Sequence, residues 1–334
     1  MMCIAAVAGG SAFDENLKEV NFVIPKGWPK PVYNLNRNKP TTSGFMLGRK
    51  LFFDPMLSRD GSTSCASCHT QFSGFTHVDH NVSHGINGLK GTRNALVLFN
   101  LAWNKSFMWD GGVNNLEVQP LGPITSPVEM NNTLENIIKY LDTSINYKTR
   151  FYKTYGDSSV TGQRILKALA QFTCMFESYN SKYDKVMRKE QGVEFTTQEL
   201  NGYKLFRKNC ESCHKEPLFT DYSFKNIGLP VDSAYFDIGR MKITGDSGDS
   251  LKFKVPTLRN IEVSYPYMHD GRFRSLKQVL NHYSSGTVLS ATVAKEMKDG
   301  MFFTENEKTD IIAFLLTLSD KEFLLDLRFR NYRD

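Results

Sequence analysis

The sequence predicts a mainly α-helical protein made of two tandem, related domains, with long loops and little β structure. Apolar residues recur at helical spacing in several segments, whereas the apolar–polar alternation of half-buried strands is scarce. A set of short motifs also occurs twice in the same order, which indicates an internal repeat. With 334 residues, the chain is long enough for two domains that each bury a hydrophobic core.

The sequence predicts the following helices and loops. Several prolines in residues 13–43 favour an extended segment that follows the surface. Helical patterns then occupy three segments: residues 44–53, 134–141 and 162–179. Residues 54–116 are rich in Gly and Asn and are expected to form loops. Thr304 and Glu307 give the capping-box signal of a further helix, which extends to Leu318.

These patterns also predict how the chain is divided. The polar stretch 182–194 is expected to link the two domains. We expect an extended N-terminal segment with an export-signal remnant at 1–43, an N-terminal domain at 44–181, a C-terminal domain at 195–320 and a C-terminal tail at 321–334.

The composition indicates a globular protein without a membrane span. Apolar residues make up 40% and charged residues 23% of the chain, values that argue against disorder. The net charge of +6 suits an acidic protein partner, but no Lys/Arg run is long enough to predict nucleic-acid binding. No run of apolar residues has the length of a transmembrane helix.

Residues 1–12 are apolar and rich in small side chains, like the end of an export signal. Cleavage after Ala12 and lipid attachment to Cys3 are two outcomes that this pattern allows. A terminal extension without a function is the third. The basic residues that usually begin such a signal are not seen in this segment, so the location has to be inferred from other features.

The internal repeat consists of four pairs of motifs. They are Gly-x-Lys-Leu-Phe at 48–52 and 202–206, Cys-x-x-Cys-His at 65–69 and 210–214, Arg-Asn at 93–94 and 259–260, and Met-x-Asp-Gly at 108–111 and 268–271. A leucine follows each methionine at the same interval, at Leu116 and Leu276. Chance explains one such match but not four in the same order, so two related modules lie in tandem.

Cys-x-x-Cys-His is the attachment signature of c-type haem: the thiols add to the haem vinyl groups and the histidine binds the iron. A zinc site would need further ligands nearby, and a redox dithiol would follow a βαβ pattern, which is absent. A chain of this size also needs no disulfides. The predicted haem attachment residues are Cys65, Cys68, Cys210 and Cys213, and the predicted proximal iron ligands are His69 and His214.

The sequence therefore predicts two cytochrome-c-like haem domains with two covalently bound haem c groups. Attachment of this kind takes place outside the cytoplasm, which predicts a periplasmic protein. An electron carrier needs two strong ligands on each iron, whereas a peroxidase needs one iron with an open sixth position and an acid–base group beside it.

Several segments resemble the bacterial di-haem cytochrome c peroxidases and the related MauG-type enzymes. They occur in the family's order and extend over about residues 45–318. Besides the two haem motifs, they are Leu-Phe-Phe-Asp-Pro at 51–55, Gly-Thr-Arg-Asn at 91–94, Phe-Met-Trp-Asp-Gly at 107–111, Gly-Pro-Ile at 122–124, Pro-Val-Glu-Met at 127–130, Val-Pro-Thr-Leu-Arg-Asn at 255–260 and Pro-Tyr-Met-His-Asp-Gly at 266–271.

The resemblance assigns catalytic roles to three residues. Glu129 matches the distal acid–base glutamate, and a carboxylate suits the transfer of a proton between the two peroxide oxygens. Gln119 matches a polar companion in the same pocket, and Trp109 matches the tryptophan between the two haems. Without the resemblance, Glu129 would be interpreted as a surface acid near a helix N-terminus and Trp109 as a core residue.

The resemblance also implies one calcium ion between the haem domains. Asn94 and the main-chain carbonyl groups of Lys254 and Pro256 match its ligands, and oxygen donors suit this hard cation. This assignment depends on the resemblance alone.

In the peroxidases of this family, a loop histidine occupies the sixth position of the first haem and leaves on activation. His84 is the candidate for this switch ligand, although its spacing from Arg93 does not align cleanly with the family histidine. His77 and His80 lie close by. The alternative is a solvated loop histidine and a five-coordinate first iron.

The peroxidases usually close the second haem with methionine, whereas alignment from Leu276 places Tyr283 there, as in MauG-type enzymes. A tyrosinate favours ferric iron and lowers the reduction potential. Tyr283 is therefore the expected distal ligand, with Met297, Met301 and His282 as competitors. A packed aromatic side chain on a helix is the structural alternative.

Three functions follow from these observations. The first is a peroxidase that reduces hydrogen peroxide to water at the N-terminal, peroxidatic haem, with electrons from a small cytochrome c or cupredoxin entering through the C-terminal haem. The second is a MauG-type oxidase that uses peroxide to oxidise a protein or another external substrate. The third is an electron carrier without catalysis. Glu129 and the difference between the halves favour an enzyme, and the peroxidase is preferred. A homodimer is one expected assembly.

Overall fold

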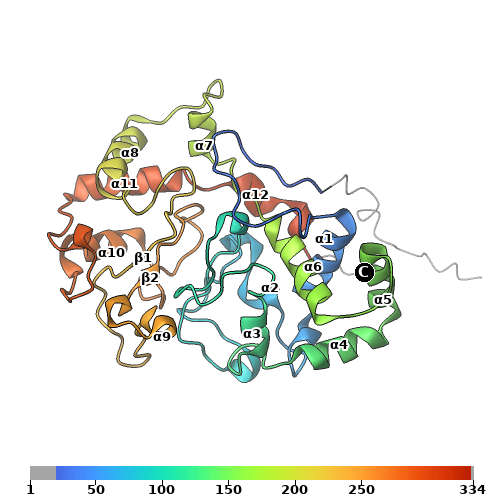
Figure 1. The fold of residues 1–334 in the computed structure, drawn as a ribbon. Helices are drawn as coiled ribbons and strands as arrows, with labels where there is room; N and C mark the ends of the chain where they lie inside the picture. Colours follow the sequence, from blue (N-terminus) through green and yellow to red (C-terminus); the bar gives the residue numbers. More distant parts are fainter. Residues whose placement is uncertain (1–19, 332–334) are drawn as a thin grey trace, which may run out of the picture.

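The computed structural model describes residues 20–331 and is mainly helical, with long loops and one small sheet (Figure 1). This confirms the predicted fold class. The expected export signal, with Cys3 and Ala12, lies outside the described residues. Within those residues, no helix has the length and apolar character needed to cross a membrane.

The described elements follow the chain in two groups. The helices of the first group are α1 (Thr42–Phe53), α2 (Cys65–Cys68), α3 (Leu121–Thr125), α4 (Leu134–Thr143), α5 (Ile145–Tyr155) and α6 (Gly162–Cys174). The second group consists of α7 (Lys182–Met187), α8 (Thr197–Asn209), β1 (Phe224–Lys225), α9 (Met241–Thr244), β2 (Phe253–Lys254), α10 (Leu276–Asn281), α11 (Glu305–Leu316) and α12 (Lys321–Leu325). Strands β1 and β2 pair in antiparallel fashion.

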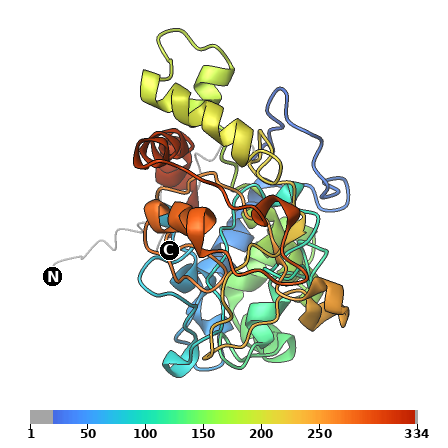
Figure 2. The ribbon, with the colours of Figure 1, turned by 90° about the vertical axis from the view of Figure 1, so that its left-hand side faces the viewer.

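Each half is built on one pair of closely packed helices, α1 with α6 and α8 with α11 (Figures 1 and 2). Glycine makes both contacts possible. A Cβ atom on Gly48 would lie 2.0 Å from the carbonyl oxygen of Ala168, and one on Gly202 would lie 1.9 Å from that of Asp310. The repeated Gly-x-Lys-Leu-Phe motif is therefore the place where the first helix of each half meets its partner.

Two hydrophobic cores surround these helix pairs. The core of the N-terminal half contains α1 and α6, with Phe52, Phe172 and Phe176 in edge contact. The core of the C-terminal half centres on Phe206 and Phe314, whose ring centroids are 5.1 Å apart. Both cores are rich in aromatic side chains, which bury a large apolar area each.

The end of the chain returns to the first core. Phe323 and Phe329 are buried there, with ring centroids 5.8 and 6.1 Å from that of Phe75. The side chain of Gln71 donates a hydrogen bond of 2.7 Å to the carbonyl of Asp326. The segment expected as a tail thus completes the N-terminal core.

The extended segment near the N-terminus lies against both halves. Trp28 packs edge-on against Trp103, with 5.0 Å between ring centroids, and the indole of Trp103 donates to the carbonyl of Pro29. On its other side, the guanidinium of Arg259 lies 4.7 Å from the ring centroid of Trp28. Arg259 belongs to the C-terminal half, so this segment connects the two halves.

The helix expected at 162–179 ends at Cys174. Two hydrogen bonds with Asn100 account for its shorter length: the Asn100 N–H donates to the carbonyl of Phe176, and the Ser178 N–H donates to the side chain of Asn100. These main-chain groups are therefore not available for a helix. The helix expected up to Leu318 similarly ends at Leu316.

The stretch 182–194, which was expected to link the two domains, begins with a helix. Residues 182–187 form α7, in which Tyr183 and Asp184 are buried. Arg259, itself fully buried, donates two hydrogen bonds of 2.7 and 2.8 Å to the carboxylate of Asp184. This part of the chain is anchored to the C-terminal half.

Candidate functional site

The first Cys-x-x-Cys unit forms the short helix α2. Ser64 and Ser67 make a capping box at its N-terminus, and His69 follows directly at its C-terminus. The Nδ1 atom of His69 lies 2.7 Å from the carbonyl oxygen of Phe75, which identifies Nδ1 as the donor. Burial lowers the pKa of His69 to about 4. The ring is therefore neutral, and its Nε2 atom is free to bind a metal.

The second unit follows α8 and repeats this arrangement. The Nδ1 atom of His214 lies 3.1 Å from the carbonyl oxygens of both Phe219 and Pro256. Burial lowers the pKa of His214, so this ring is also neutral with Nε2 available. A main-chain carbonyl thus orients each predicted proximal histidine, as is usual for metal-bound imidazoles.

The cysteines of both units are free thiols. Burial raises the pKa of Cys65 and Cys210 to about 12, the opposite of what a reactive dithiol requires. Among the described residues, no group of three or more His, Cys, Asp or Glu side chains has the arrangement of a metal site. The geometry is therefore that of thioether attachment and does not suit zinc or thiol–disulfide exchange.

Each unit opens onto a cavity. The cavity beside Cys65, Cys68 and His69 has a volume of about 600 Å³, and the one beside Cys210, Cys213 and His214 has a volume of about 200 Å³. Apolar side chains dominate both linings. Two attachment thiols, one neutral histidine with a free Nε2 and an apolar space fit a c-type haem in each half. The residues that line both cavities are Asn94, Ala95, Leu96, Val97, Trp109, Lys254, Val255, Pro256 and Thr257.

Glu129, Gln119 and His84 all line the first cavity. Burial raises the pKa of Glu129, and the hydroxyl of Ser83 acts in the opposite direction as a hydrogen-bond donor. The main chain of Glu129 is fixed by the N–H of Ile86, which donates to its carbonyl at 2.8 Å. The predicted acid–base group is thus half-buried beside the first haem site.

His84 lies in a cluster of three histidines. Its ring centroid is 4.0 Å from that of His80, and the Nδ1 atom of His80 is 2.9 Å from the Nε2 atom of His77. The carbonyl of His84 accepts a hydrogen bond from Cys68 at 3.3 Å. His84 thus lies at the cavity, with its ring packed against His80.

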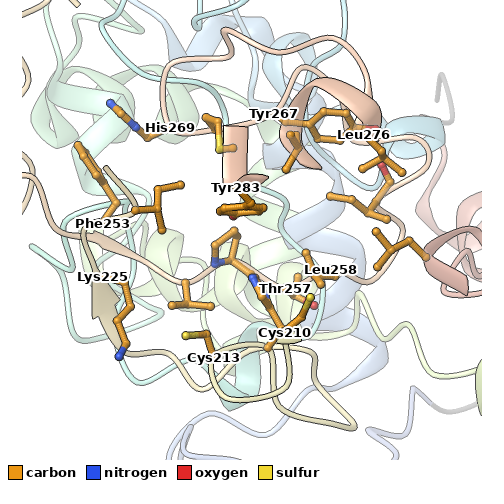
Figure 3. Close-up of a pocket in the computed structure, with 18 of the residues that line it drawn as sticks. Cys210, Cys213, Lys225, Phe253, Thr257, Leu258, Tyr267, His269, Leu276 and Tyr283 are labelled. Atoms are coloured by element: carbon orange, nitrogen blue, oxygen red, sulfur yellow. Dashed lines mark hydrogen bonds between the residues drawn. The ribbon is translucent and has the colours of Figure 1, made fainter. Parts of the chain in front are cut away.

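Tyr283 lies in a π-helical turn, His282–Gly286, that continues α10. Such turns are frequent at functional sites. Figure 3 shows the ring of Tyr283 near the centre of the second cavity, with Cys210 and Cys213 below it. Burial raises the pKa of this phenol above its ordinary value. A bound metal ion would be needed to favour the tyrosinate form here.

The competing candidate ligands of the second haem differ in whether they line the cavity. Met297 and Met301 line the same cavity, and the N–H of Met301 donates to the carbonyl of Tyr283 at 3.0 Å. His282 is occupied elsewhere, because its Nε2 atom is bonded to the carbonyl of Ile227 at 2.9 Å. The geometry therefore leaves Tyr283 and the two methionines as candidates.

Trp109 lies in the wall that both cavities share. Its indole N–H donates to the carbonyl of Asn94 at 2.9 Å, and its own carbonyl accepts from the N–H of Lys254 at 2.7 Å. His269, the residue at the matching position of the second Met-x-Asp-Gly motif, lies 6.4 Å from Trp109 between ring centroids. The two repeats thus meet at this wall.

The three residues expected to bind calcium are also in this wall. The side chain of Asn94 donates through Nδ2 to the carbonyl of Asn81, which leaves its Oδ1 atom as a potential ligand. The ammonium group of Lys254 is buried and donates to the carbonyl of Ser106 at 2.9 Å. The carbonyl of Pro256 already accepts from His214, as described above.

Sequence reasoning missed three residues that organise the site. Ser83 interacts with Glu129, and His269 stacks on Phe253 with 3.7 Å between ring centroids. Arg93 bonds to Asp110 in its own half and, at 2.5 and 2.8 Å, to Asp237 in the other half. Arg93 and His269 belong to the repeated motifs, so the repeat was a signal that could have identified them. No feature of the sequence pointed to Ser83.

Comparison with known proteins agrees with this geometry. A family model for di-haem cytochrome c peroxidase matches residues 42–192, and one for cytochrome c matches residues 200–319. The cytochrome c551 peroxidase of Nitrosomonas europaea is 37% identical over 277 residues, which cover 82% of this chain and 79% of that protein. The methylamine utilization protein MauG of Methylorubrum extorquens is 34% identical, with 94% of this chain and 88% of the relative covered. Among solved structures, a MauG-like protein associated with microbial copper homeostasis has a TM-score of 0.86 and 30% identity, covering 93% of this chain and 99% of that one.

The fold and the two attachment sites define a c-type cytochrome with two haem domains. The chain belongs to the di-haem cytochrome c peroxidase and MauG family. It is accordingly an oxidoreductase that acts on peroxide and has two c-type haems. Relatives named as peroxidases and as MauG proteins occur at similar identity, so the family does not decide between the first two hypotheses.

Proposed function

We propose that this protein reduces hydrogen peroxide to water in its N-terminal half, with electrons delivered through its C-terminal half by a small redox protein. The donor is a cytochrome c or a cupredoxin. The observation that supports this proposal most directly is the half-buried carboxyl group of Glu129 in the first cavity. A non-catalytic electron carrier has no use for such a group.

The proposed role of Glu129 is proton transfer. When bound, the haem iron supplies the redox chemistry that breaks the O–O bond. Glu129 takes a proton from one peroxide oxygen and delivers it to the other, which leaves as water. Two electrons and two protons complete the reduction of one peroxide to two water molecules. Gln119, on the same cavity wall, is proposed to orient the peroxide.

Electron passage between the halves is assigned to the shared wall. Trp109 is buried there and is held at its indole N–H and at its carbonyl. A rigid aromatic ring between the two cavities suits this role, because it shortens the gap that an electron must cross. His84 is proposed as the ligand that closes the first haem in the resting protein, and a five-coordinate first iron remains the alternative.

The test is the substitution Glu129→Gln in the haem-loaded protein. We expect the rate of reaction with peroxide, followed by stopped-flow absorbance, to fall at least about a hundredfold. Haem content should stay unchanged. Glu135→Gln is the matched control, because Glu135 is an exposed glutamate on α4 that pairs with Lys139. A Glu129→Gln protein that reacts as fast as this control would remove Glu129 from the mechanism.

A second candidate is a MauG-type oxidase, and Tyr283 is the observation that favours it. A tyrosinate ligand stabilises ferric iron and lowers the reduction potential, which opposes easy electron entry from a donor. In this version, the protein uses peroxide to oxidise a protein or another external substrate, and the two haems, when bound, would supply the sites that store the oxidising equivalents.

The two candidates differ in their need for prior reduction. The peroxidase hypothesis predicts that half-reduced protein reacts much faster with peroxide than fully oxidised protein. The oxidase hypothesis predicts a fast reaction of the fully oxidised protein and an oxidised product that persists without an external substrate. Magnetic resonance spectra of the Tyr283→Phe and Met297→Leu proteins would identify the ligand of the second haem.

We also propose one calcium ion in the shared wall, bound by the side-chain oxygen of Asn94 and the carbonyls of Lys254 and Pro256. Oxygen ligands of this kind suit Ca²⁺. Metal analysis of the purified protein before and after treatment with a chelator tests this site. A protein free of calcium that retains full activity would exclude it.

We assign the protein to the periplasm, because c-type haem is attached outside the cytoplasm. A lipid anchor at Cys3 and a homodimer are further expectations. Fractionation of cells, mass spectrometry of the N-terminus and light scattering of the purified protein test them in turn.

A further inference from the structure

Two neighbouring residues of the π-helical turn His282–Gly286 have different surroundings. Tyr283 lines the second cavity, where Figure 3 shows its ring. The side chain of His282 is also buried, and its Nε2 atom lies 2.9 Å from the carbonyl oxygen of Ile227. Because a carbonyl only accepts hydrogen bonds, Nε2 carries the proton and donates. Successive residues of a helical turn project in different directions, so an anchor on His282 also fixes the direction of Tyr283.

The main chain around Ile227, which accepts this bond, lies in the wall of the same cavity. The N–H of Gly228 donates to the side-chain oxygen of Asn226 at 2.8 Å. The side-chain amide of Asn226, which is buried, donates in turn to the hydroxyls of Ser290 at 3.1 Å and Thr292 at 2.9 Å. Ile227 therefore offers His282 an acceptor that is itself held in place.

The competing ligand Met297 has anchors of its own. The carbonyl oxygen of Asn226 accepts from the N–H of Ala294 at 2.9 Å, and the carbonyl oxygen of Ala294 accepts from the N–H of Met297 at 2.9 Å. Met297 is buried at the end of the short helix Lys295–Met297. These bonds do not involve His282, so its loss would leave Met297 in place.

The ring of His282 is enclosed by its surroundings. Its centroid lies 5.9 Å from that of Phe273, and a Cβ atom on Gly286 would lie only 3.0 Å from its Nδ1 atom. The hydroxyl of Ser284 donates to the carbonyl of Leu280 at 2.8 Å, which ties the turn to α10. The imidazole therefore has little room to leave Ile227.

We propose that His282 is a positioning residue, whose hydrogen bond to Ile227 keeps Tyr283, rather than Met297, as the distal ligand of the second haem. This inference rests on the proposed ligation by Tyr283 and applies to the peroxidase and the oxidase alike. Without the bond, the turn is free to move Tyr283 away from the centre of the cavity. The axial ligand sets the reduction potential of a haem iron, so His282 acts on that potential through Tyr283.

The experiment titrates haem-loaded ferric protein with cyanide and follows the magnetic resonance signal of the second haem. His282→Leu removes the donor while it retains a bulky side chain. We expect cyanide to displace Tyr283 at a concentration about fivefold lower than in the parent protein, the effect of one hydrogen bond of about 1 kcal/mol. The reduction potential of the second haem should also rise, because its tyrosine ligand is held less firmly.

Three variants control this measurement. His282→Gln, whose amide nitrogen reaches about as far as Nε2, should restore the parent cyanide concentration and potential. His282→Asn is too short to reach Ile227 and should behave like His282→Leu, so it tests the same bond if the leucine variant does not fold. Ser285→Ala is the matched control in the same turn, because Ser285 is exposed and its hydroxyl lies 3.4 Å from the carbonyl of Asn281.

The outcomes separate this inference from the proposals on which it rests. If Tyr283→Phe leaves the spectrum of the second haem unchanged, ligation by Tyr283 is overturned and the inference with it. If Tyr283→Phe changes the spectrum but His282→Leu and Ser285→Ala need the same cyanide concentration, the role of His282 alone is overturned. The double variant His282→Leu/Tyr283→Phe should match Tyr283→Phe, and a further change there would also refute the inference. None of these measurements uses peroxide, so they are independent of the test on Glu129.

Discussion

The helix contact at Gly202 makes a sharp prediction for the substitution Gly202→Ala. The added Cβ atom would lie 1.9 Å from the carbonyl oxygen of Asp310, and real Cβ atoms almost never approach closer than 3.0 Å. The obstacle is main chain, so no side chain can rotate away. Helices α8 and α11 must therefore move apart by about 1 Å, in an interior packed as densely as a crystal.

The expected cost follows from this displacement. A gap of that size forfeits a large part of the dispersion energy between the facing side chains, including Phe206 and Phe314. Overpacking of this type typically costs about 1–3 kcal/mol, and the better helix propensity of alanine returns up to about 1 kcal/mol. We expect a net loss of about 1–2 kcal/mol for Gly202→Ala.

The assay is unfolding of the haem-loaded protein by heat and by urea, followed by circular dichroism. Gly162→Ala is the matched control, because the atom nearest to its Cβ would be the flexible end of the Leu134 side chain, at 3.0 Å. We expect this control to be neutral or slightly stabilised. Gly48→Ala, the equivalent change in the first half, should destabilise like Gly202→Ala. Equal stability of Gly202→Ala and Gly162→Ala would refute the reasoning.

Three further predictions concern buried groups. Asp184→Asn leaves the buried Arg259 without its charge partner and should cost about 3–5 kcal/mol in urea unfolding. Burial alone would raise the pKa of Asp184, but the bonds from Arg259 hold it below its ordinary value. The ion pair therefore stabilises the fold fully above about pH 4 and less as the pH falls. In the Asn variant, the free energy of unfolding should depend less on pH in this acidic range. Burial raises the pKa of Glu177 to about 8, so its ionisation weakens the fold as the pH rises towards 8. The melting temperature of Glu177→Gln should equal that of the parent protein near pH 5 and exceed it near pH 8. Trp109→Phe loses the bond to Asn94 and should slow reduction of the first haem by way of the second, in stopped-flow experiments, at unchanged haem content.

The features that sequence could predict are those encoded in short, contiguous segments. The haem attachment residues follow from one five-residue motif, and helices α1 and α4 follow from local apolar periodicity. The two related halves follow from motifs that recur in the same order. The glycines of the repeat could not be interpreted from sequence, because the neighbour that requires Gly202 is the main chain of Asp310, far along the chain.

The features that the sequence did not reveal depend on contacts between residues that are far apart in the chain. The helix at 162–174 is shorter than expected because Asn100 binds the main chain that follows it. In the expected link at 182–194, residues 182–187 form a helix whose Asp184 is buried and bonded to Arg259. In each case the decisive contact is made by a polar residue that is distant in the sequence.

The return of the C-terminal end to the first core has a consequence for biosynthesis. The ring of Phe75, whose carbonyl orients His69, stacks on Phe176 and is flanked by Phe323 and Phe329. Phe323 and Phe329 are synthesised only when translation is almost finished, so the core of the N-terminal half is completed only after nearly the whole chain has been made. A stop codon placed before Phe323 would thus leave a complete pair of thioether cysteines beside a histidine whose supporting aromatic cluster stays open to water.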